Sequence, residues 1–425
     1  MRETVSEKIV NERTGDSYTV VHHKSGLDLL LYPMEGYKFT SAMFSTDYGS
    51  INNCFKTDDE EDFVNVPDGI AHYLEHKLFE NEDCDVFALY AATGADGNAM
   101  TGYENTTYLF TCTENFYESL RILLSFVQKP YFTEENVQKE QGIIAQEIRM
   151  TLDIPRCRCF HELLRAMYSA HPVRIDIGGT EESIAQITPE LLYKCYYAFY
   201  DLNNMVLTAA GNFEIDKVIE ICDELLKSCE DKHLEIRLPE EPAEIAEPFV
   251  KTEMGLGMPI FSIGFKCPAY SGMERLEKEA EVYFGLELLA GTMSPLYKRL
   301  TDEHLIAGGL GYQFFTGKGY FALLFEGESE QPERVAEYIL EAVDEVRKNG
   351  FDREEFELMK RAEFGDLVKR LDNPEACTDG MLSAYYNGVD MFAEGRVLEK
   401  VTIEGVEAAI NRFICRENMA VSVVK

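Results

Sequence analysis

Tryptophan is absent from the 425-residue sequence, and basic side chains are scarce. The 40 Lys and Arg residues stand against 76 Asp and Glu residues, so the formal net charge at pH 7 is −36. A protein that binds a nucleic-acid backbone, or one that docks on anionic lipid, needs a basic surface. The charge therefore argues against nucleic acid and membrane surfaces as partners, and it favours basic peptides.

Long apolar runs are also missing, since none approaches the roughly 20 residues that span a bilayer. The first eight residues include several charged side chains and contain no apolar segment, so we expect no secretory signal there. The eleven cysteines are scattered, odd in number and without a Cys-x-x-Cys pair. This pattern is typical of reduced thiols, and we expect a cytoplasmic protein.

Hydrophobic residues make up 45% of the chain, which is enough to form folded cores. The length predicts two domains, and strand-like and helix-like segments mix throughout the first half. In segment 230–249, three prolines alternate with glutamates, as is typical of an extended linker. We predict three parts: a first domain at 1–228, an acidic linker at 229–250 and a second domain at 251–425.

The second half repeats short stretches of the first half at one fixed offset. Thr188-Pro189-Glu190 recurs as Thr402-Ile403-Glu404, and Asn204-Met205 recurs as Asn418-Met419. The offset is 402 − 188 = 214 in the first case and 418 − 204 = 214 in the second. This spacing predicts two homologous α+β domains.

The sharpest chemical feature is the sequence His72-Tyr73-Leu74-Glu75-His76. On a helix, residues three or four apart share a face, so His72, Glu75 and His76 fall within an arc of roughly 100°. Two imidazoles at this spacing can bind one Zn²⁺, and the carboxylate beside them can accept a proton from water at the metal. The order is inverted relative to the commoner His-Glu-x-x-His, and the inverted order is itself a zinc motif.

A catalytic zinc needs a third protein ligand and one open position. We expect a helix over residues 134–150, because Thr133 is a suitable N-cap and acidic residues occupy the first turn. Glu140 and Glu147 lie seven residues apart on one face of this helix. Helix geometry alone does not choose between them.

The stretch from Asp68 to Phe79 resembles the zinc helix of the pitrilysin/insulinase family of inverted-motif metallopeptidases, in its short bacterial processing-peptidase-like form. The resemblance implies that Glu147, 71 positions after His76, is the third Zn²⁺ ligand. It implies that Glu140 assists catalysis by orienting a ligand or balancing charge. It further implies two homologous domains, each a mostly antiparallel sheet with helices packed on it, arranged as half of a clamshell.

Segment 98–108 is similar to the Asn-Ala-x-Thr segment of the same family. In that family the segment forms an edge strand that pairs with the substrate backbone. The resemblance implies substrate-binding roles for Asn98, Ala99, Thr101 and Tyr108. Recognition by an added strand would depend on the substrate backbone more than on its side chains.

The chain departs from the family pattern in its second half. Active members usually carry Leu-Arg-x(6)-Tyr there, but this chain has Thr301 at the Arg position and Gly308 at the Tyr position. Arg299 and Tyr312 lie nearby at the wrong spacing. The resemblance therefore implies a homodimer, or a heterodimer with a related subunit, in which the partner supplies the missing Arg and Tyr.

Taken together, the residues and the resemblance predict a zinc endopeptidase that acts on peptides or unfolded polypeptide segments. The alternative is a non-catalytic peptide-binding or assembly subunit that has kept the zinc motif. A structural metal protein would need a fourth ligand, and the sequence shows no candidate for one.

Overall fold

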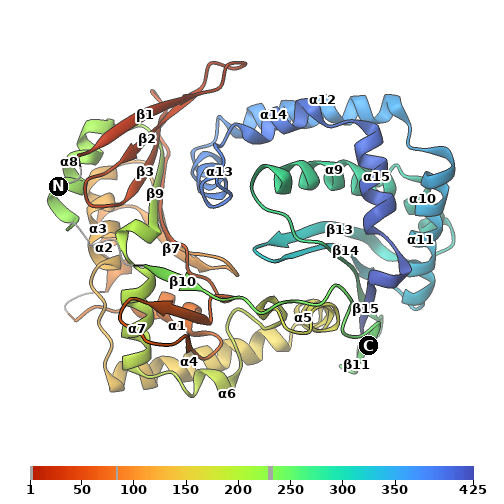
Figure 1. Cartoon of the computed structure of the whole chain (residues 1–425), viewed down its shortest axis with the longest axis horizontal. Helices are drawn as coiled ribbons and strands as arrows, with labels where there is room; N and C mark the ends of the chain where they lie inside the picture. Colours follow the sequence, from red (N-terminus) through yellow and green to blue (C-terminus); the bar gives the residue numbers. More distant parts are fainter. Residues whose placement is uncertain (1–2, 83–84, 228–232) are drawn as a thin grey trace. The chain divides into compact units, whose positions relative to one another are not determined.

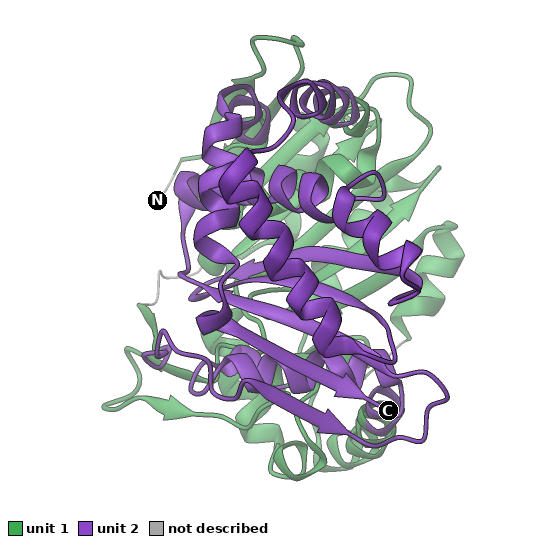
Figure 2. Ribbon diagram, turned by 90° about the vertical axis from the view of Figure 1, so that its right-hand side faces the viewer, with its two compact units in different colours: residues 1–148, 176–237, 367–392 green, residues 149–175, 238–366, 393–425 purple. Residues whose placement is uncertain are grey.

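The computed structural model describes residues 3–82, 85–227 and 233–425. The chain forms two compact units, which Figure 2 shows in different colours. Unit 1 comprises residues 1–148, 176–237 and 367–392, and unit 2 comprises residues 149–175, 238–366 and 393–425. Residues 229–232 of the predicted linker lie outside the described part of the chain.

Unit 1 is built on a seven-stranded sheet (Figure 1). Strands β3 and β9 run parallel, and the other neighbouring strands run antiparallel. Across the sheet the order is β1 (Val5–Val10), β2 (Ser17–His22), β3 (Asp28–Pro33), β9 (Met205–Gly211), β4 (Thr40–Thr46), β8 (Thr106–Cys112) and β7 (Asp96–Thr101). A smaller antiparallel sheet has the order β10 (Leu234–Ile236), β5 (Cys54–Thr57) and β6 (Val64–Asn65).

Unit 2 is built on a five-stranded sheet. Strands β11 and β15 run parallel, and the remaining neighbours run antiparallel. Across the sheet the order is β11 (Phe249–Thr252), β15 (Met419–Val424), β12 (Ile260–Cys267), β14 (Tyr320–Glu328) and β13 (Ala307–Gly317). The fold class is therefore α+β with mostly antiparallel sheets, as the sequence predicts.

Helices from both halves of the sequence complete each unit. The helices of unit 1 are α1 (Ile70–Leu78), α2 (Val86–Thr93), α3 (Phe116–Val127), α4 (Glu134–Leu152, whose last turn is assigned to unit 2), α6 (Glu181–Ile184), α7 (Pro189–Phe199), α8 (Ile215–Leu225) and α13 (Pro374–Tyr386). The helices of unit 2 are α5 (Pro155–Met167), α9 (Gly272–Ala290), α10 (Pro295–Asp302), α11 (Pro332–Asn349), α12 (Arg353–Arg370, whose last residues are assigned to unit 1), α14 (Ala393–Lys400) and α15 (Ile403–Phe413). Within the described residues, no helix is long and apolar enough to cross a membrane.

The two sheets share one topology, which reveals the duplication. In unit 1 the strand order β3-β9-β4-β8-β7 places the first, fifth, second, fourth and third of these strands side by side. The order β11-β15-β12-β14-β13 in unit 2 follows the same sequence of positions, again with the parallel pair first. Thr188 and Thr402, which are 214 residues apart, cap α7 and α15 in the same way. The predicted repeat is confirmed.

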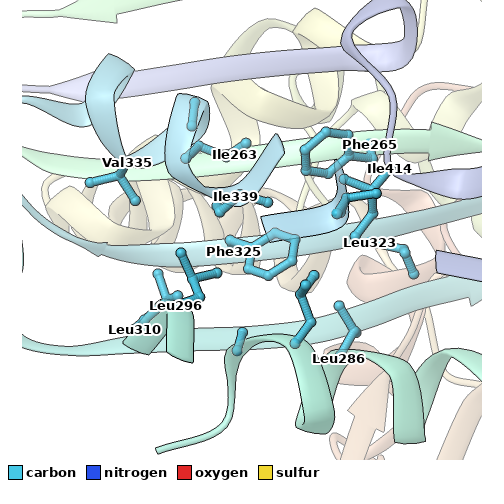
Figure 3. Close-up of a cluster of buried hydrophobic side chains, with 14 of the residues drawn as sticks. Ile263, Phe265, Leu286, Leu296, Leu310, Leu323, Phe325, Val335, Ile339 and Ile414 are labelled. Atoms are coloured by element: carbon cyan, nitrogen blue, oxygen red, sulfur yellow. The ribbon is translucent and has the colours of Figure 1, made fainter. Parts of the chain in front are cut away.

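The core of unit 2 forms where the inward side chains of its sheet meet the covering helices (Figure 3). Phe265 and Phe325 from β12 and β14 pack with Leu286 of α9 and Ile339 of α11, and all four are almost completely buried. Each such side chain stabilises the fold by roughly 1.5–3 kcal/mol. This apolar layer fixes the helices on the sheet.

One helix of each repeat packs on the sheet of the other repeat. Helix α5 precedes the linker in sequence, but its Leu163 and Met167 pack against Gly264 in the unit 2 sheet. A Cβ at Gly264 would lie 2.5 Å from the Met167 sulfur, so the absence of a side chain makes the close approach possible. The Cys159 thiol of α5 also donates to the Ser422 carbonyl of β15.

Helix α13 makes the reverse exchange. It follows the linker in sequence, but Met381 and Leu382 belong to a buried cluster with Leu30, Met43 and Val206 of the unit 1 sheet. The compact units therefore differ from the division at 1–228 and 251–425 in two segments, 149–175 and 367–392. The periodicity of an amphipathic helix shows which face is buried, but it does not identify the sheet that buries it.

A buried ion pair anchors the second part of the predicted linker within unit 2. The Lys266 ammonium lies 2.6 Å from the Glu241 carboxylate and donates to the carbonyls of Pro242 and Glu244. Glu241 also accepts from the backbone N–H groups of residues 169–171, at 2.6 to 3.0 Å. Both charged side chains are at least 90% buried, so breaking the pair would leave an uncompensated charge.

This ion pair predicts a specific pH dependence of stability. Burial alone would raise the pKa of Glu241, but the Lys266 ammonium and the three N–H groups outweigh it and lower the pKa from 4.5 to about 2. A carboxyl group with a lowered pKa stabilises the folded state above its unfolded pKa, and this contribution is lost as pH falls through the folded pKa. We expect unit 2 to lose stability as pH falls from about 4.5 to about 2.

Urea unfolding of the parent chain and of Glu241→Gln over this pH range measures the effect. The substitution should reduce the loss of stability on acidification, because it removes the titrating group. The exposed neighbour Glu240 provides the matched control, Glu240→Gln, which should keep the parental pH dependence. An unchanged pH dependence in Glu241→Gln would contradict the assignment.

Candidate metal centre

Helix α1 presents the predicted motif on one partly exposed face. Ile70, Tyr73, Leu74 and Leu78 are buried, which turns the opposite face away from the core. The polar face carries His72, Glu75 and His76, all of which are intermediate in exposure. Helix α1 therefore places the three side chains on one face, as the sequence predicts.

Three glycines fix the start of this helix against a loop. Gly69, the N-cap of α1, has φ 89°, and a Cβ there would lie 2.4 Å from the Gly178 carbonyl oxygen. A Cβ at Gly179, whose φ is 77°, would lie 2.5 Å from the carbonyl oxygen of Asp68. The Ser183 hydroxyl donates to the same carbonyl. The backbones pack so closely that only glycine fits at positions 69 and 179, which sets the position of the helix.

Helix α4 brings Glu147 to the two imidazoles. Its Oε1 lies 3.7 Å from His72 Nε2, and its Oε2 lies 3.5 Å from His76 Nε2. One ligand atom from each of the three residues lies within 4.8 Å of the others. Two imidazole nitrogens and a carboxylate oxygen form a donor set suited to a catalytic zinc ion, so these residues fit the metal. Of the two glutamates that the sequence left open, Glu147 is the one that faces both Nε2 atoms.

Glu140 lies on the other side of His76. Its Oε1 is 3.0 Å from His76 Nδ1, and its side chain is mostly buried. Burial alone would raise the pKa of Glu140, but the hydrogen bond and the charge of His76 outweigh burial and lower the pKa. A proton held on Nδ1 leaves the Nε2 lone pair of His76 directed toward Glu147. Glu140 is therefore placed to orient the His76 imidazole.

The two imidazoles have different environments. Burial, together with the nearby charge of His76, lowers the pKa of His72 to about 4, so this ring stays neutral. His72 Nδ1 is buried and has no hydrogen-bond partner among the described residues. Burial also lowers the pKa of His76, but the Glu140 hydrogen bond and the three surrounding carboxylates outweigh it, and the net shift is upward. A metal ion bound at Nε2 would displace the proton from that nitrogen of His76.

Glu75 lies on the same face without belonging to the ligand group. Its Oε2 accepts a hydrogen bond of 2.6 Å from the Thr101 hydroxyl. Burial, with a smaller contribution from the charge of Glu147, raises the pKa of Glu75. A carboxylate with a raised pKa beside a metal-type donor set is suited to exchanging protons with water.

The predicted edge strand is β7, which is the outermost strand of the unit 1 sheet beside β8. Asn98 is exposed on this strand, and its side-chain oxygen accepts from the backbone N–H of Ala99. The free edge of β7 is the place where a further strand could pair. The roles of Asn98 and Ala99 in substrate binding stay predictions.

The structure buries the side chain of Tyr108 completely, so the predicted role of this residue in substrate binding has no exposed side chain to support it. Tyr108 lies on β8, between β7 and β4, and its hydroxyl shares a 2.9 Å hydrogen bond with the hydroxyl of Tyr200. Side chains alternate between the two faces of a strand, and on an inner strand such as β8 those that face the helices are buried. The sequence motif does not show which of its residues belong to the inner strand and which to the edge strand. The hydroxyl of Thr101 also has a partner within the chain, because it donates a hydrogen bond to Glu75.

The residues at and near the incomplete Leu-Arg-x(6)-Tyr pattern make their contacts within unit 2. Thr301 donates to the Tyr297 carbonyl, and Gly308 lies at an irregularity in β13 with φ 84°. Arg299 pairs with Glu341 at 2.6 Å, and the Tyr312 hydroxyl donates to Glu287. Within the described residues, Arg299 and Tyr312 thus have these contacts inside unit 2.

Comparisons with known proteins match both halves of the chain. The model described as Insulinase (Peptidase family M16) matches residues 64–181, and the model described as Peptidase M16 inactive domain matches residues 186–363. A Bacillus subtilis protein, named uncharacterized zinc protease YmfH, is 36% identical over 410 residues, which cover 95% of this chain and 96% of its own length. The chain belongs to the M16 peptidase family.

Solved structures agree with the M16 assignment. An M16-like peptidase from Alicyclobacillus acidocaldarius superimposes with a TM-score of 0.91 at 34% identity, covering 100% of this chain and 99% of its own. A protease from Helicobacter pylori superimposes with a TM-score of 0.83 over both full chains, and at 18% identity it shows the shared fold. The M16 fold therefore extends over the whole chain.

The geometry predicts different effects for the two glutamates of this M16 chain. Glu147→Gln should reduce Zn²⁺ affinity more than 100-fold, because it removes a charged ligand atom. Glu140→Gln should reduce affinity by about 10–100-fold, because it disturbs only the orientation of His76. Competition with a fluorescent zinc chelator measures both affinities.

The exposed Glu135 on the same helix provides the control, Glu135→Gln, which should bind Zn²⁺ as tightly as the parent chain. If Glu140→Gln abolished zinc binding while Glu147→Gln retained it, the assignment of the third ligand would be reversed.

Proposed function

We propose that this M16 chain is a zinc-dependent endopeptidase that hydrolyses peptides or unfolded polypeptide segments. The observation that carries the proposal is the convergence of His72, His76 and Glu147, with Glu75 on the same face of α1. The name zinc protease given to YmfH supports the same activity. His72, His76 and Glu147 would hold the metal.

The residues of this chain define the proton transfers of the proposed reaction. When bound, zinc polarises the scissile carbonyl and lowers the pKa of water beside it. Glu75 takes a proton from the attacking water and passes it to the amine that leaves when the C–N bond breaks. The raised pKa of Glu75 favours this second step, because its protonated form is less costly than that of an exposed glutamate. Glu140 keeps His76 in the required tautomer.

The substrate would bind along the free edge of β7. A peptide in extended form could add a strand there and pair through backbone groups, so the sequence of the peptide would matter less than its extended conformation. Ala99 lies within this strand, and the neighbouring Asn98 is exposed. Such recognition requires a flexible or unfolded segment, because a folded strand has no free backbone groups to offer.

We further propose that the active form is a dimer, with an identical or a related chain. The departures at Thr301 and Gly308, together with the engagement of Arg299 and Tyr312, support a partner that supplies the missing Arg and Tyr. These same departures favour the second candidate function, a non-catalytic peptide-binding or assembly subunit. The intact donor set and Glu75 argue for the peptidase.

A cytoplasmic location is part of the proposal. All the cysteines that the structure describes are free, including the close pair Cys157 and Cys159. Free thiols in this number are typical of proteins kept in a reducing compartment.

The decisive variant is Glu75→Gln. It should keep one zinc ion per chain, since Glu75 is outside the ligand group, while kcat for a quenched fluorescent peptide falls by at least about 100-fold. The measurement pairs zinc content with cleavage rate, for the chain alone and with its partner subunit. Glu118→Gln, an exposed change on α3, should have parental activity.

Equal cleavage by Glu75→Gln would show that Glu75 is not the proton acceptor. A zinc-loaded parent chain that binds peptides but cleaves none, even with its partner, would favour the non-catalytic subunit instead.

The net charge of −36 generates a separate prediction about substrates. If acidic groups attract the substrate, a basic peptide should bind more weakly as salt rises, because screening shortens the range of the attraction. We expect KM for a basic peptide to rise several-fold between about 50 and 500 mM NaCl, while a neutral peptide of equal length keeps its KM. A constant KM for the basic peptide would show that the acidity does not select substrates.

A further inference from the structure

Thr101 connects the free edge strand to the catalytic carboxylate. Its hydroxyl donates to Glu75 Oε2 at 2.6 Å, a distance typical of a charge-assisted O–H···O⁻ hydrogen bond. Within the described ranges, no other residue is seen to donate a side-chain hydrogen bond to this carboxylate. We infer that Thr101 is a positioning residue that holds Glu75 for proton transfer, an inference that rests on the proposed peptidase function.

The alternation of β7 places this hydroxyl on the helix side of the sheet. Asp96, Asn98 and Met100 are exposed, whereas Gly97, Ala99 and Thr101 are partly buried. A Cβ at Gly97 would lie 2.4 Å from the Tyr90 ring of α2, so this set of side chains points toward the helices. Thr101 is on the same side, and there its hydroxyl meets Glu75 of α1.

Small residues keep β7 close to α1 and α2. The three inward positions hold Gly97, Ala99 and Thr101, and Thr101 has a short side chain that ends in a donor. A larger residue at position 101 would push the strand away, and an apolar one would leave the half-buried Glu75 carboxylate without this partner. A threonine at position 101 therefore fits a role in positioning Glu75 better than a role in contacting a substrate.

One strand consequently serves two purposes. Its outer edge is free for a substrate backbone, while its inner side carries the hydroxyl that orients Glu75. Pairing of a substrate with β7 would restrict the motion of the strand, and Thr101 would transmit this restriction to the carboxylate. The base would then be best oriented when the edge is occupied.

The test compares Thr101→Val and Thr101→Ser in the zinc-loaded chain with its partner. Valine has the shape of threonine without the hydroxyl, and serine keeps the hydroxyl. Both substitutions leave the backbone of the strand unchanged. We therefore expect kcat of Thr101→Val to fall about tenfold, with KM within about twofold and with unchanged zinc content. Thr101→Ser should recover most of kcat.

Thr106 offers a matched control, because it lies opposite Thr101 on β8 and its hydroxyl donates to the Tyr48 carbonyl instead. Thr106→Val removes a hydroxyl from the same strand pair, so it reports on general loss of stability. It should lower the melting temperature without the selective fall in kcat. A parental kcat in Thr101→Val, or a change in KM alone, would overturn the positioning role.

Infrared difference spectra give a readout that does not depend on turnover. The Glu75 carboxylate band, identified by subtracting the spectrum of Glu75→Gln, should shift in Thr101→Val and return in Thr101→Ser. An unshifted band would overturn the contact. If the parent chain itself cleaves no peptide, the proposed function fails together with the catalytic role of Thr101. An active parent with an undiminished Thr101→Val variant overturns only the role of Thr101.

Discussion

The approach of Glu147 to His72 and His76 is the constraint on which the rest of unit 1 depends. Three polar groups converge between two helices, so α1 and α4 must be held in place by contacts elsewhere. At one end, the backbone packing of Gly69 against Gly178 fixes the start of α1. On the far side of His76, the buried carboxylate of Glu140 fixes the ring. The ligand geometry is therefore maintained by surrounding packing and not by the ligands themselves.

Among the described residues the metal-type donor set lies in unit 1, although both units are built on the same duplicated fold. Five strands of the unit 1 sheet follow the strand order of the unit 2 sheet, and the edge strands β7 and β13 occupy the same position in their repeats. Helix α9 of the second unit contains no histidine, so it lacks the imidazole ligands that α1 carries. Unit 2 has the same architecture and a large apolar core, but it does not carry the histidines of α1. The exchange of α5 and α13 makes each unit depend on both halves of the chain.

The sequence predicted well wherever the information is local. Helical spacing placed His72, Glu75 and His76 on one face, and the offset of 214 identified the repeat that the shared topology confirms. Prediction was weaker where side chains meet across strands. Tyr108 is in the core because β8 is an inner strand, and Thr101 contacts Glu75 because β7 lies against α1. Neither contact leaves a periodic signal in the sequence.

By itself, the sequence determined the kind of chemistry and the kind of fold, because these follow from residue type, spacing and repetition along the chain. Two candidate metal ligands, His72 and His76, follow from their spacing on one helix, and the negative charge follows from composition. Only the tertiary structure showed that Glu147 faces both Nε2 atoms while Glu140 contacts His76 Nδ1. It also showed which sheet each of α5 and α13 covers. Those outcomes depend on packing between segments far apart in the chain, where close contact, burial and hydrogen bonding select one arrangement.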